Sequence, residues 1–143
     1  MIMTEKISSS WKGGMRVDNQ TDGHQMIIDQ PVGMGGENEG PNPLAYLLIA
    51  LGGCLATVAA IVARQEQVDL RGFSIEVEGD YDVDFLMGNT KEGRAGFSEI
   101  REMVEIDADL TDDEKAAFFE MVHSRCPVTD TILRQTQIEY KVK

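Results

Sequence analysis

The feature that most constrains the fold is a stretch of twenty residues, Leu44 to Ala63, that contains no charged side chain. Its length and apolar character meet the criterion for a membrane-spanning helix. However, the stretch is rich in glycine and alanine, and its flanks carry neither a basic cluster nor an aromatic belt. A helix that is apolar all round can also be the buried centre of a domain or a dimer. We therefore predict a buried central helix, with Pro43 in its first turn and Arg64 at its solvated end, and no membrane contact.

Size and charge exclude several classes of protein. The 143 residues suit one domain, residues 1–143, which would bury about 70% of its unfolded surface and need no disulfide staples. The chain has 25 Asp and Glu against 13 Lys and Arg, a net charge of −12, which argues against binding nucleic acid or anionic membranes. Residues 1–10 lack the pattern of a signal peptide, so we expect a cytoplasmic, reducing compartment.

The sequence before the central helix predicts a β-hairpin. Apolar runs at residues 15–17 and 25–28 flank an Asp-Gly pair at Asp22, which is a turn signal between two strands. Residues 31–43 contain four glycines and three prolines, and we expect them to form a loop.

The sequence after the central helix predicts a second pair of strands, two helices and a last strand. Apolar residues alternate with polar ones at residues 73–77 and 100–106, and a glycine-bearing loop separates them. Residues 111–114 form a capping box that opens a helix, and Pro127 suits the first position of another. Alternation returns at residues 138–142. The predicted order β-β-α-β-β-α-α-β defines an α+β fold.

The two cysteines are the candidates for chemistry. Cys54 lies within the central helix after Gly52 and Gly53, a pair that costs helix stability and usually lets a neighbour or a substrate approach the backbone. Cys126 lies at the predicted N-cap before Pro127, where a helix N-terminus stabilises a thiolate. Taken singly, each cysteine is more typical of an inert buried residue.

The local sequences around both cysteines resemble the OsmC/Ohr family. The resemblance rests on the segment 40–43, on Gly53-Cys54 eleven residues after Pro43, and on Cys126-Pro127-Val128-Thr129, and it covers essentially the whole chain. It implies antiparallel sheets around a long buried helix, in an intertwined homodimer with two sites at the subunit interface.

The resemblance also implies a reaction. In the best-studied branches, the cysteine of the central helix attacks an organic hydroperoxide and becomes a sulfenic acid, and the second cysteine condenses with it to a disulfide. A thiol reductant, often a lipoylated protein, then resets the enzyme. On this basis Cys54 attacks, Cys126 resolves and Arg16, the only arginine before Cys54, stabilises the thiolate. The helix-terminus argument instead favours Cys126 as the thiolate, so the order of attack stays open.

One position departs from the peroxidase pattern. Those branches place a glutamate directly after the proline that starts the central helix, where it pairs with the arginine, and this chain has Leu44 there. Glu37 and Glu39, in the preceding loop, are the carboxylates that could replace it. The departure supports a second hypothesis, that the chain is a non-catalytic dimeric module that binds a small apolar or thiol-containing ligand.

Other side chains are weaker candidates. His123 lies three residues before Cys126, where it could donate a proton or simply end a helix, and we favour the latter. His24 follows the predicted turn and is expected to be exposed. Trp11, Phe118 and Phe119 are expected in the core or at an interface. No spacing supports a metal site, and we expect no cofactor.

Overall fold

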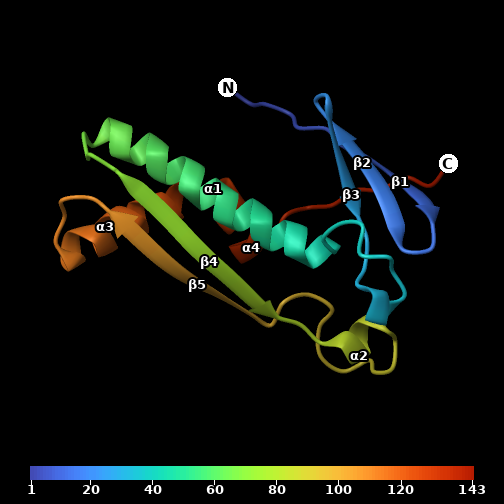
Figure 1. The fold of residues 1–143 in the computed structure, drawn as a ribbon. Helices are drawn as coiled ribbons and strands as arrows, with labels where there is room; N and C mark the ends of the chain where they lie inside the picture. The colour runs from blue at the N-terminus through green and yellow to red at the C-terminus, as the bar shows by residue number, and fades with distance from the viewer. The chain divides into compact units, whose positions relative to one another are not determined.

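The computed structural model describes all of residues 1–143, which form two compact units, Met1–Leu47 and Leu48–Lys143 (Figure 1). Helix α1 (Pro43–Gln65) begins in the first unit and continues through the second. The predicted α+β class is confirmed, because antiparallel strands and a long apolar helix make up the chain.

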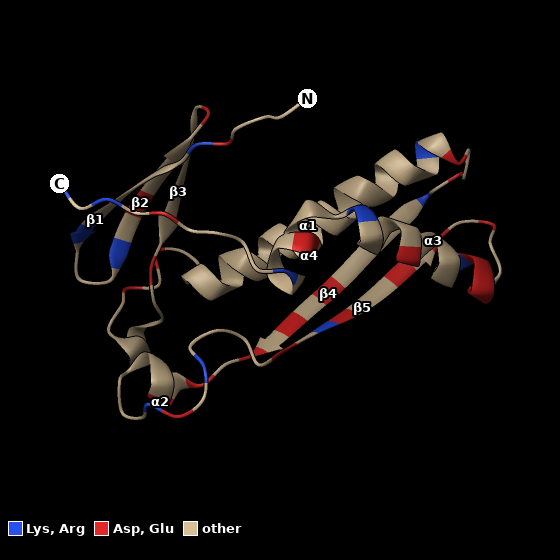
Figure 2. Ribbon diagram, turned by 180° about the vertical axis from the view of Figure 1, so that it is seen from behind, with Lys and Arg blue, Asp and Glu red and all other residues tan.

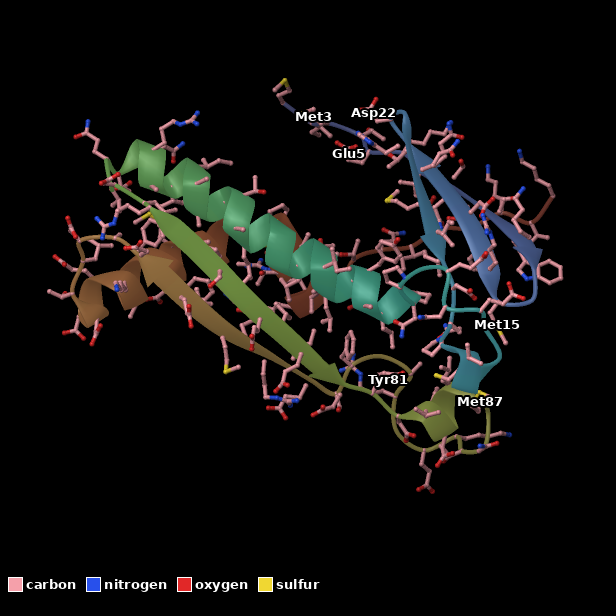
Figure 3. All side chains as sticks on the ribbon, viewed as in Figure 1. Met3, Glu5, Met15, Asp22, Tyr81 and Met87 are labelled. Carbon is pink, nitrogen blue, oxygen red and sulfur yellow. The ribbon has the colours of Figure 1, made fainter.

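The N-terminal unit is a three-stranded antiparallel sheet in the order β1-β2-β3. Its strands are β1 (Ser8–Gly13), β2 (Arg16–Thr21) and β3 (His24–Ile28). Asp22 and Gly23 form the β2–β3 turn with φ of 42° and 78°, the positive values that a two-residue hairpin turn requires, and Figure 3 labels Asp22 at its tip. The predicted hairpin is confirmed. Strand β1 was not predicted, because its serines give no apolar alternation.

The loop after β3 is organised by a buried carboxylate. Asp29 is 1% exposed and accepts hydrogen bonds from the backbone N–H groups of Gln30, Glu37 and Glu39. Gly36 packs so closely on the Gln30 backbone that no side chain would fit there. The predicted loop is confirmed, with one short 3₁₀ helix, η1 (Val32–Met34), within it.

The C-terminal unit packs α1 against a two-stranded antiparallel hairpin of β4 (Gly72–Asp80) and β5 (Glu99–Asp107). Six residues on one face of α1 are buried: Leu51, Leu55, Val58, Ala59, Val62 and Ala63. Side chains of alternate parity on the hairpin pack against them, including Phe73, Ile75 and Ile106. Most residues of the opposite parity are exposed, and many of them are Asp or Glu. Figure 2 shows the acidic residues of both strands in red. Helix α1 is long and apolar enough to cross a membrane, but here it is the core helix of this unit.

The remaining helices close the same core. The capping box at Thr111 opens α3 (Asp112–Arg125), and α4 (Pro127–Leu133) follows it directly, so both predicted helices are confirmed. The loop between β4 and β5 contains one short helix that was not predicted, α2 (Val83–Leu86), capped by Asp82.

The last predicted strand is wrong for the isolated chain. The alternating residues Ile138, Tyr140 and Val142 lie in irregular backbone and are 85%, 87% and 91% exposed. A strand requires a neighbour that shares its backbone hydrogen bonds, and no strand of the chain pairs with this segment. Apolar alternation is therefore present without the partner that would complete it.

Candidate functional site

The structure brings the two cysteines together. Cys54 lies in the middle of α1 and Cys126 is the N-cap of α4, 72 residues later in the chain. Their Sγ atoms are 3.0 Å apart, within hydrogen-bond distance, and both thiols are free. The chain therefore holds two reduced sulfurs at a separation from which a small movement would form a disulfide bond.

Cys126 is placed to carry the negative charge of this pair. It is 1% exposed, and its sulfur accepts a hydrogen bond from the backbone N–H of Thr129 at 3.4 Å. Burial alone would raise the pKa of Cys126, but hydrogen bonds to its sulfur from Cys54, Thr129 and Val128 outweigh burial and lower that pKa. This result supports the expectation that a helix N-cap favours the thiolate.

Cys54 is the protonated and more accessible partner. Burial, followed by the hydrogen bond with Cys126, raises the pKa of the Cys54 thiol. Cys54 lines an open pocket of about 440 Å³ whose other walls include Thr57, Val58 and Ile61 of α1. Cys54 therefore borders this pocket, whereas Cys126, which is 1% exposed, does not line it.

The one charged side chain that lines this pocket is Arg125. Its guanidinium donates a hydrogen bond from Nη1 to Oε1 of Gln65, at the C-terminal end of α1, at 2.8 Å. The sequence suggested a positive charge beside Cys126, and the structure shows that this charge borders the pocket of Cys54.

The two glycines before Cys54 serve different contacts. A Cβ atom on Gly52 would lie 3.5 Å from methyl groups of Ile75 and Val77, so Gly52 faces strand β4. Gly53 is exposed and lines the Cys54 pocket, and a Cβ atom added to it would have no neighbour within 4 Å. Gly52 therefore lies against a neighbouring strand, whereas Gly53 leaves the backbone beside Cys54 open.

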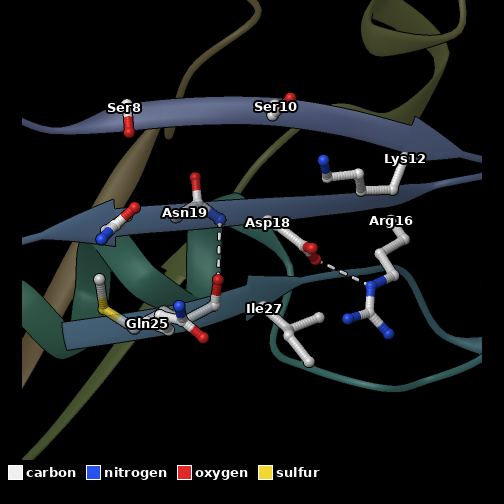
Figure 4. Close-up of a pocket in the computed structure, with 10 residues that line it drawn as sticks. Ser8, Ser10, Lys12, Arg16, Asp18, Asn19, Gln25 and Ile27 are labelled. Carbon is white, nitrogen blue, oxygen red and sulfur yellow. Dashed lines mark hydrogen bonds and ion pairs between the residues drawn. The ribbon is translucent and has the colours of Figure 1, made fainter.

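Arg16 belongs to the N-terminal unit, where two carboxylates bind it. Its Nε atom donates to Oδ1 of Asp18 at 2.8 Å, as Figure 4 shows, and its Nη1 atom donates to Oε2 of Glu39 at 2.6 Å. These hydrogen bonds, first that to Asp18 and then that to Glu39, raise the pKa of Arg16 above its already high value. Arg16 thus pairs with a carboxylate of the loop that precedes α1.

Glu39 is held in place by Asp29. The backbone N–H of Glu39 donates to the Asp29 carboxylate at 3.1 Å, while the Glu39 side chain reaches Arg16. Hydrogen bonds from Glu39 and Gln30 lower the pKa of Asp29, burial opposes them, and the N–H of Glu37 and the charge of Arg16 add to the decrease. Sequence reasoning named Glu39 only as a candidate, and no sequence signal pointed to Asp29.

The other candidates lie elsewhere. His123 contacts Glu102 and packs against the ring of Phe119, and it does not line the pocket of Cys54. His24 begins β3 and is exposed, as expected. Phe118 is buried in the core, and Trp11 is 71% exposed. No group of three or more His, Cys, Asp or Glu side chains is arranged to hold a metal ion.

Comparison with known proteins places this arrangement in a family. The OsmC-like protein family matches residues 36–141, a range that contains both cysteines. The chain belongs to the OsmC-like protein family. Among proteins of curated function, none matches the chain.

Solved structures share the fold of this OsmC-like chain. A crystal structure of an OsmC-like protein from Mycoplasma pneumoniae has a TM-score of 0.81 at 24% identity, with 93% of this chain and 89% of that one covered. An organic hydroperoxide resistance protein OsmC from Legionella pneumophila has a TM-score of 0.69 at 23% identity, with 92% and 90% covered. An organic hydroperoxide resistance protein from Elizabethkingia anophelis has a TM-score of 0.70 at 17% identity, with 91% and 88% covered.

Proposed function

We propose that this OsmC-like protein is a thiol-dependent peroxidase that reduces organic hydroperoxides through Cys54 and Cys126, in defence against oxidative stress. The observation that carries the proposal is the 3.0 Å separation of the two sulfurs beside a largely apolar pocket. Two of the structurally similar proteins are named organic hydroperoxide resistance proteins, which supports the same substrate class.

The first step uses the proton that the sulfurs share. The Cys54 sulfur attacks the terminal oxygen of the hydroperoxide, the O–O bond breaks, and the Cys54 proton passes to the Cys126 thiolate 3.0 Å away. The departing alkoxide takes a proton from solvent and leaves as the alcohol. Cys54 is now a sulfenic acid, oxidised by two electrons, and the peroxide is reduced by two.

The second step forms the disulfide. The Cys126 sulfur attacks the Cys54 sulfenic sulfur, an S–S bond replaces the S–OH bond, and the hydroxyl leaves as water with the thiol proton of Cys126. A dithiol reductant, either a small molecule or a lipoyl group, then returns both cysteines to thiols and is itself oxidised to a disulfide. Two thiols and one hydroperoxide thus give one disulfide, one alcohol and one water.

Two arginines have separate roles in this proposal. Arg16 stabilises the thiolate charge that Cys54 gains as it gives up its proton. Glu39 is the carboxylate partner of Arg16, because position 44 is a leucine. Arg125 lines the Cys54 pocket and faces any negative charge that develops on the leaving oxygen.

The proposal includes an assembly. Residues 1–143 act as one OsmC-like domain, since the family match runs across the boundary between the two compact units. Two copies form an intertwined homodimer with a site at each subunit interface, as the family resemblance implies. We place the protein in the cytoplasm, where a reducing environment keeps both cysteines free between catalytic cycles.

Intact mass after oxidation tests the proposal. One equivalent of cumene hydroperoxide should lower the mass of the parent chain by about 2 Da, the two hydrogens lost to a disulfide. Cys126→Ser should instead gain one oxygen, about 16 Da, on Cys54, and Cys54→Ser should keep its mass. In turnover with dithiothreitol, Cys54→Ser should consume no cumene hydroperoxide above the rate without protein.

The same mass measurement distinguishes the peroxidase from the second hypothesis, a non-catalytic module that binds a small apolar or thiol-containing ligand. The raised pKa of Cys54 and the absence of a carboxylate at Leu44 favour a module that binds a ligand beside a thiol it does not oxidise. An unchanged mass of the parent chain after excess hydroperoxide would reject the peroxidase and leave this module.

A further inference from the structure

A second pocket of the C-terminal unit contains an unusual carboxylate. Glu102 lies on the face of β5 that points to the core, between Ile100 and Val104, and it is paired across the hairpin with Val77. Its side chain is only 16% exposed. Every other β5 side chain of this parity is apolar, so Glu102 interrupts a face that otherwise packs against α1.

This carboxylate has little compensation within the chain. No N–H or O–H group donates a hydrogen bond to it, and the nearest titratable group is the imidazole of His123, whose Nε2 lies 3.5 Å from Oε2. A carboxylate withdrawn from water is normally paired and hydrogen-bonded, because lost hydration is costly. Glu102 therefore has acceptor capacity that a donor from outside the chain can satisfy.

The space beside Glu102 is suited to a small molecule with an apolar body. The pocket measures about 340 Å³ and is lined by aliphatic side chains, among them Leu51, Ile100 and Ile132, with Glu102, His123 and Thr129 as its polar groups. A largely apolar pocket with a few convergent polar groups is the usual form of a ligand site. Neither cysteine lines this pocket, which distinguishes it from the pocket beside Cys54.

We propose that this pocket binds a small aliphatic or aromatic primary ammonium ion, with its charged head on Glu102 and its apolar body between α1 and α4. An ammonium group supplies both the positive charge and the N–H donors that the carboxylate lacks. The net charge of −12 also raises the local concentration of cations around the chain. The proposal does not rest on the peroxidase reaction.

The pocket is connected to the thiol pair through one residue. Thr129 lines the pocket and is 5% exposed, and its backbone N–H donates to the Cys126 sulfur. Its hydroxyl oxygen has no hydrogen-bond partner within the chain. Thr129 thus borders the pocket and also contacts the Cys126 sulfur.

Calorimetric titration of the reduced full-length protein with n-hexylammonium tests the proposal. At neutral pH this amine keeps its charge, since alkylammonium groups lose their proton near pH ~10.4. Binding should be saturable, and n-hexanol and hexanoate should bind at least about tenfold more weakly, because neither offers a charged donor. Equal affinity for hexanol would show that only the apolar walls bind and would overturn the assignment.

Matched variants locate the site. Glu102→Gln should weaken hexylammonium binding at least about tenfold, whereas Glu105→Gln, with the same charge change on the exposed face of β5, should bind as the parent does. An equal loss in both variants, or none in Glu102→Gln, would overturn the proposal. If Glu102→Gln does not fold by circular dichroism, Ile132→Trp decides instead, because the indole fills the pocket and should abolish binding. Since no peroxide is present, this result is independent of the mass measurements above.

Discussion

At the residue scale, a peroxide-reactive thiol needs access to its substrate and a low pKa, and here each of the two cysteines has only one of these properties. Cys54 lines an open pocket but has a raised pKa, whereas Cys126 has a lowered pKa but is 1% exposed. In the proposed reaction the two thiols act together, because the buried Cys126 sulfur lies 3.0 Å from Cys54 and can take its proton as Cys54 attacks. The two sulfurs therefore titrate as one coupled unit, in which Cys126 loses its proton at lower pH than Cys54 does.

The titration of this pair is the first prediction. The ultraviolet absorbance of thiolates in the reduced parent should rise in two steps, one below the ordinary thiol range and one above it. Cys126→Ser should lose the low step, and Cys54→Ser should move it to higher pH, because the thiol that donates to Cys126 is gone. A single step at the ordinary thiol pKa in the parent would contradict the assignment.

The same pKa directions set how stability depends on pH. A lowered folded-state pKa means that Cys126 contributes stability above its unfolded-state pKa, and this contribution is lost as pH falls through the folded-state pKa. The raised pKa of Cys54 acts oppositely, and its contribution is lost as pH rises through the folded-state value. Urea unfolding should therefore show a stability deficit of Cys126→Ser that grows toward alkaline pH.

The ion pair of Arg16 and Glu39 gives a further prediction. If Glu39 is the working partner of Arg16, Glu39→Gln should lower kcat/KM for cumene hydroperoxide several-fold, because the guanidinium loses a charged acceptor at 2.6 Å. Glu37→Gln is the control. Its backbone N–H also donates to Asp29, but its side chain forms no ion pair. Equal kcat/KM values in the two variants would remove Glu39 from the site while leaving the cysteine chemistry intact.

At the element scale, α1 contains one glycine that packs against β4 and one that borders open space, and this difference gives another prediction. Gly53→Ala should raise the free energy of unfolding by about 1 kcal/mol, because alanine is the better helix former and the new methyl group meets nothing. The same methyl group narrows the pocket beside Cys54, so KM for cumene hydroperoxide should rise while kcat changes less.

Gly52→Ala is the matched control for this prediction. Its methyl group would make ordinary contact with Ile75 and Val77 on β4, away from the Cys54 pocket. It should gain stability comparably in urea unfolding and leave KM unchanged. A rise in KM in both variants would show that helix geometry rather than access to Cys54 controls the substrate, and would refute the role given to Gly53.

The elements that could be predicted from the sequence are those whose determinants are local. The capping box at Thr111, the proline at Pro127 and the Asp-Gly turn at Asp22 each lie where the structure places the matching feature. Strand β1 escaped prediction because residues 8–10 are serines whose β conformation comes only from pairing with β2. Residues 138–142 show the reverse case, an alternation that has no strand beside it.

The candidate site likewise has a part that the local sequence predicts and a part that depends on contacts between distant residues. Composition left the cysteines apparently inert, and only their placement, after a glycine pair and before a proline, singled them out. The roles of Glu39 and Arg125 depend on contacts across 23 and 60 residues of sequence, with Arg16 and Gln65, which no local pattern encodes. Glu102 was missed because the alternation of apolar and polar residues predicts every carboxylate in a strand to be exposed. The pattern gives no sign that one carboxylate lies on the core face.

At the scale of the whole molecule, the chain leaves sheet edges and apolar residues without partners. Both sheets are open, so β1 and β3 are edge strands, as are β4 and β5. Ile49 and Ile61 of α1 are 56% and 44% exposed, and the alternating tail is more exposed still. Open strand edges and an unpaired alternating segment are the features that pair with another chain. They support the proposed homodimer, in which the tail of one copy extends a sheet of the other.

The tail therefore provides the last prediction. Analytical ultracentrifugation should show the parent as a dimer, and Ile138→Lys should weaken dimerisation at least about tenfold, because it places a charge on the face of the tail strand that pairing would bury. Gln137→Lys introduces the same charge at the neighbouring position, which a strand points the opposite way, and should remain as dimeric as the parent. A parent that sediments as a monomer would reject the homodimer. Equal dimerisation of both variants would instead retain the dimer and exclude the tail from its interface.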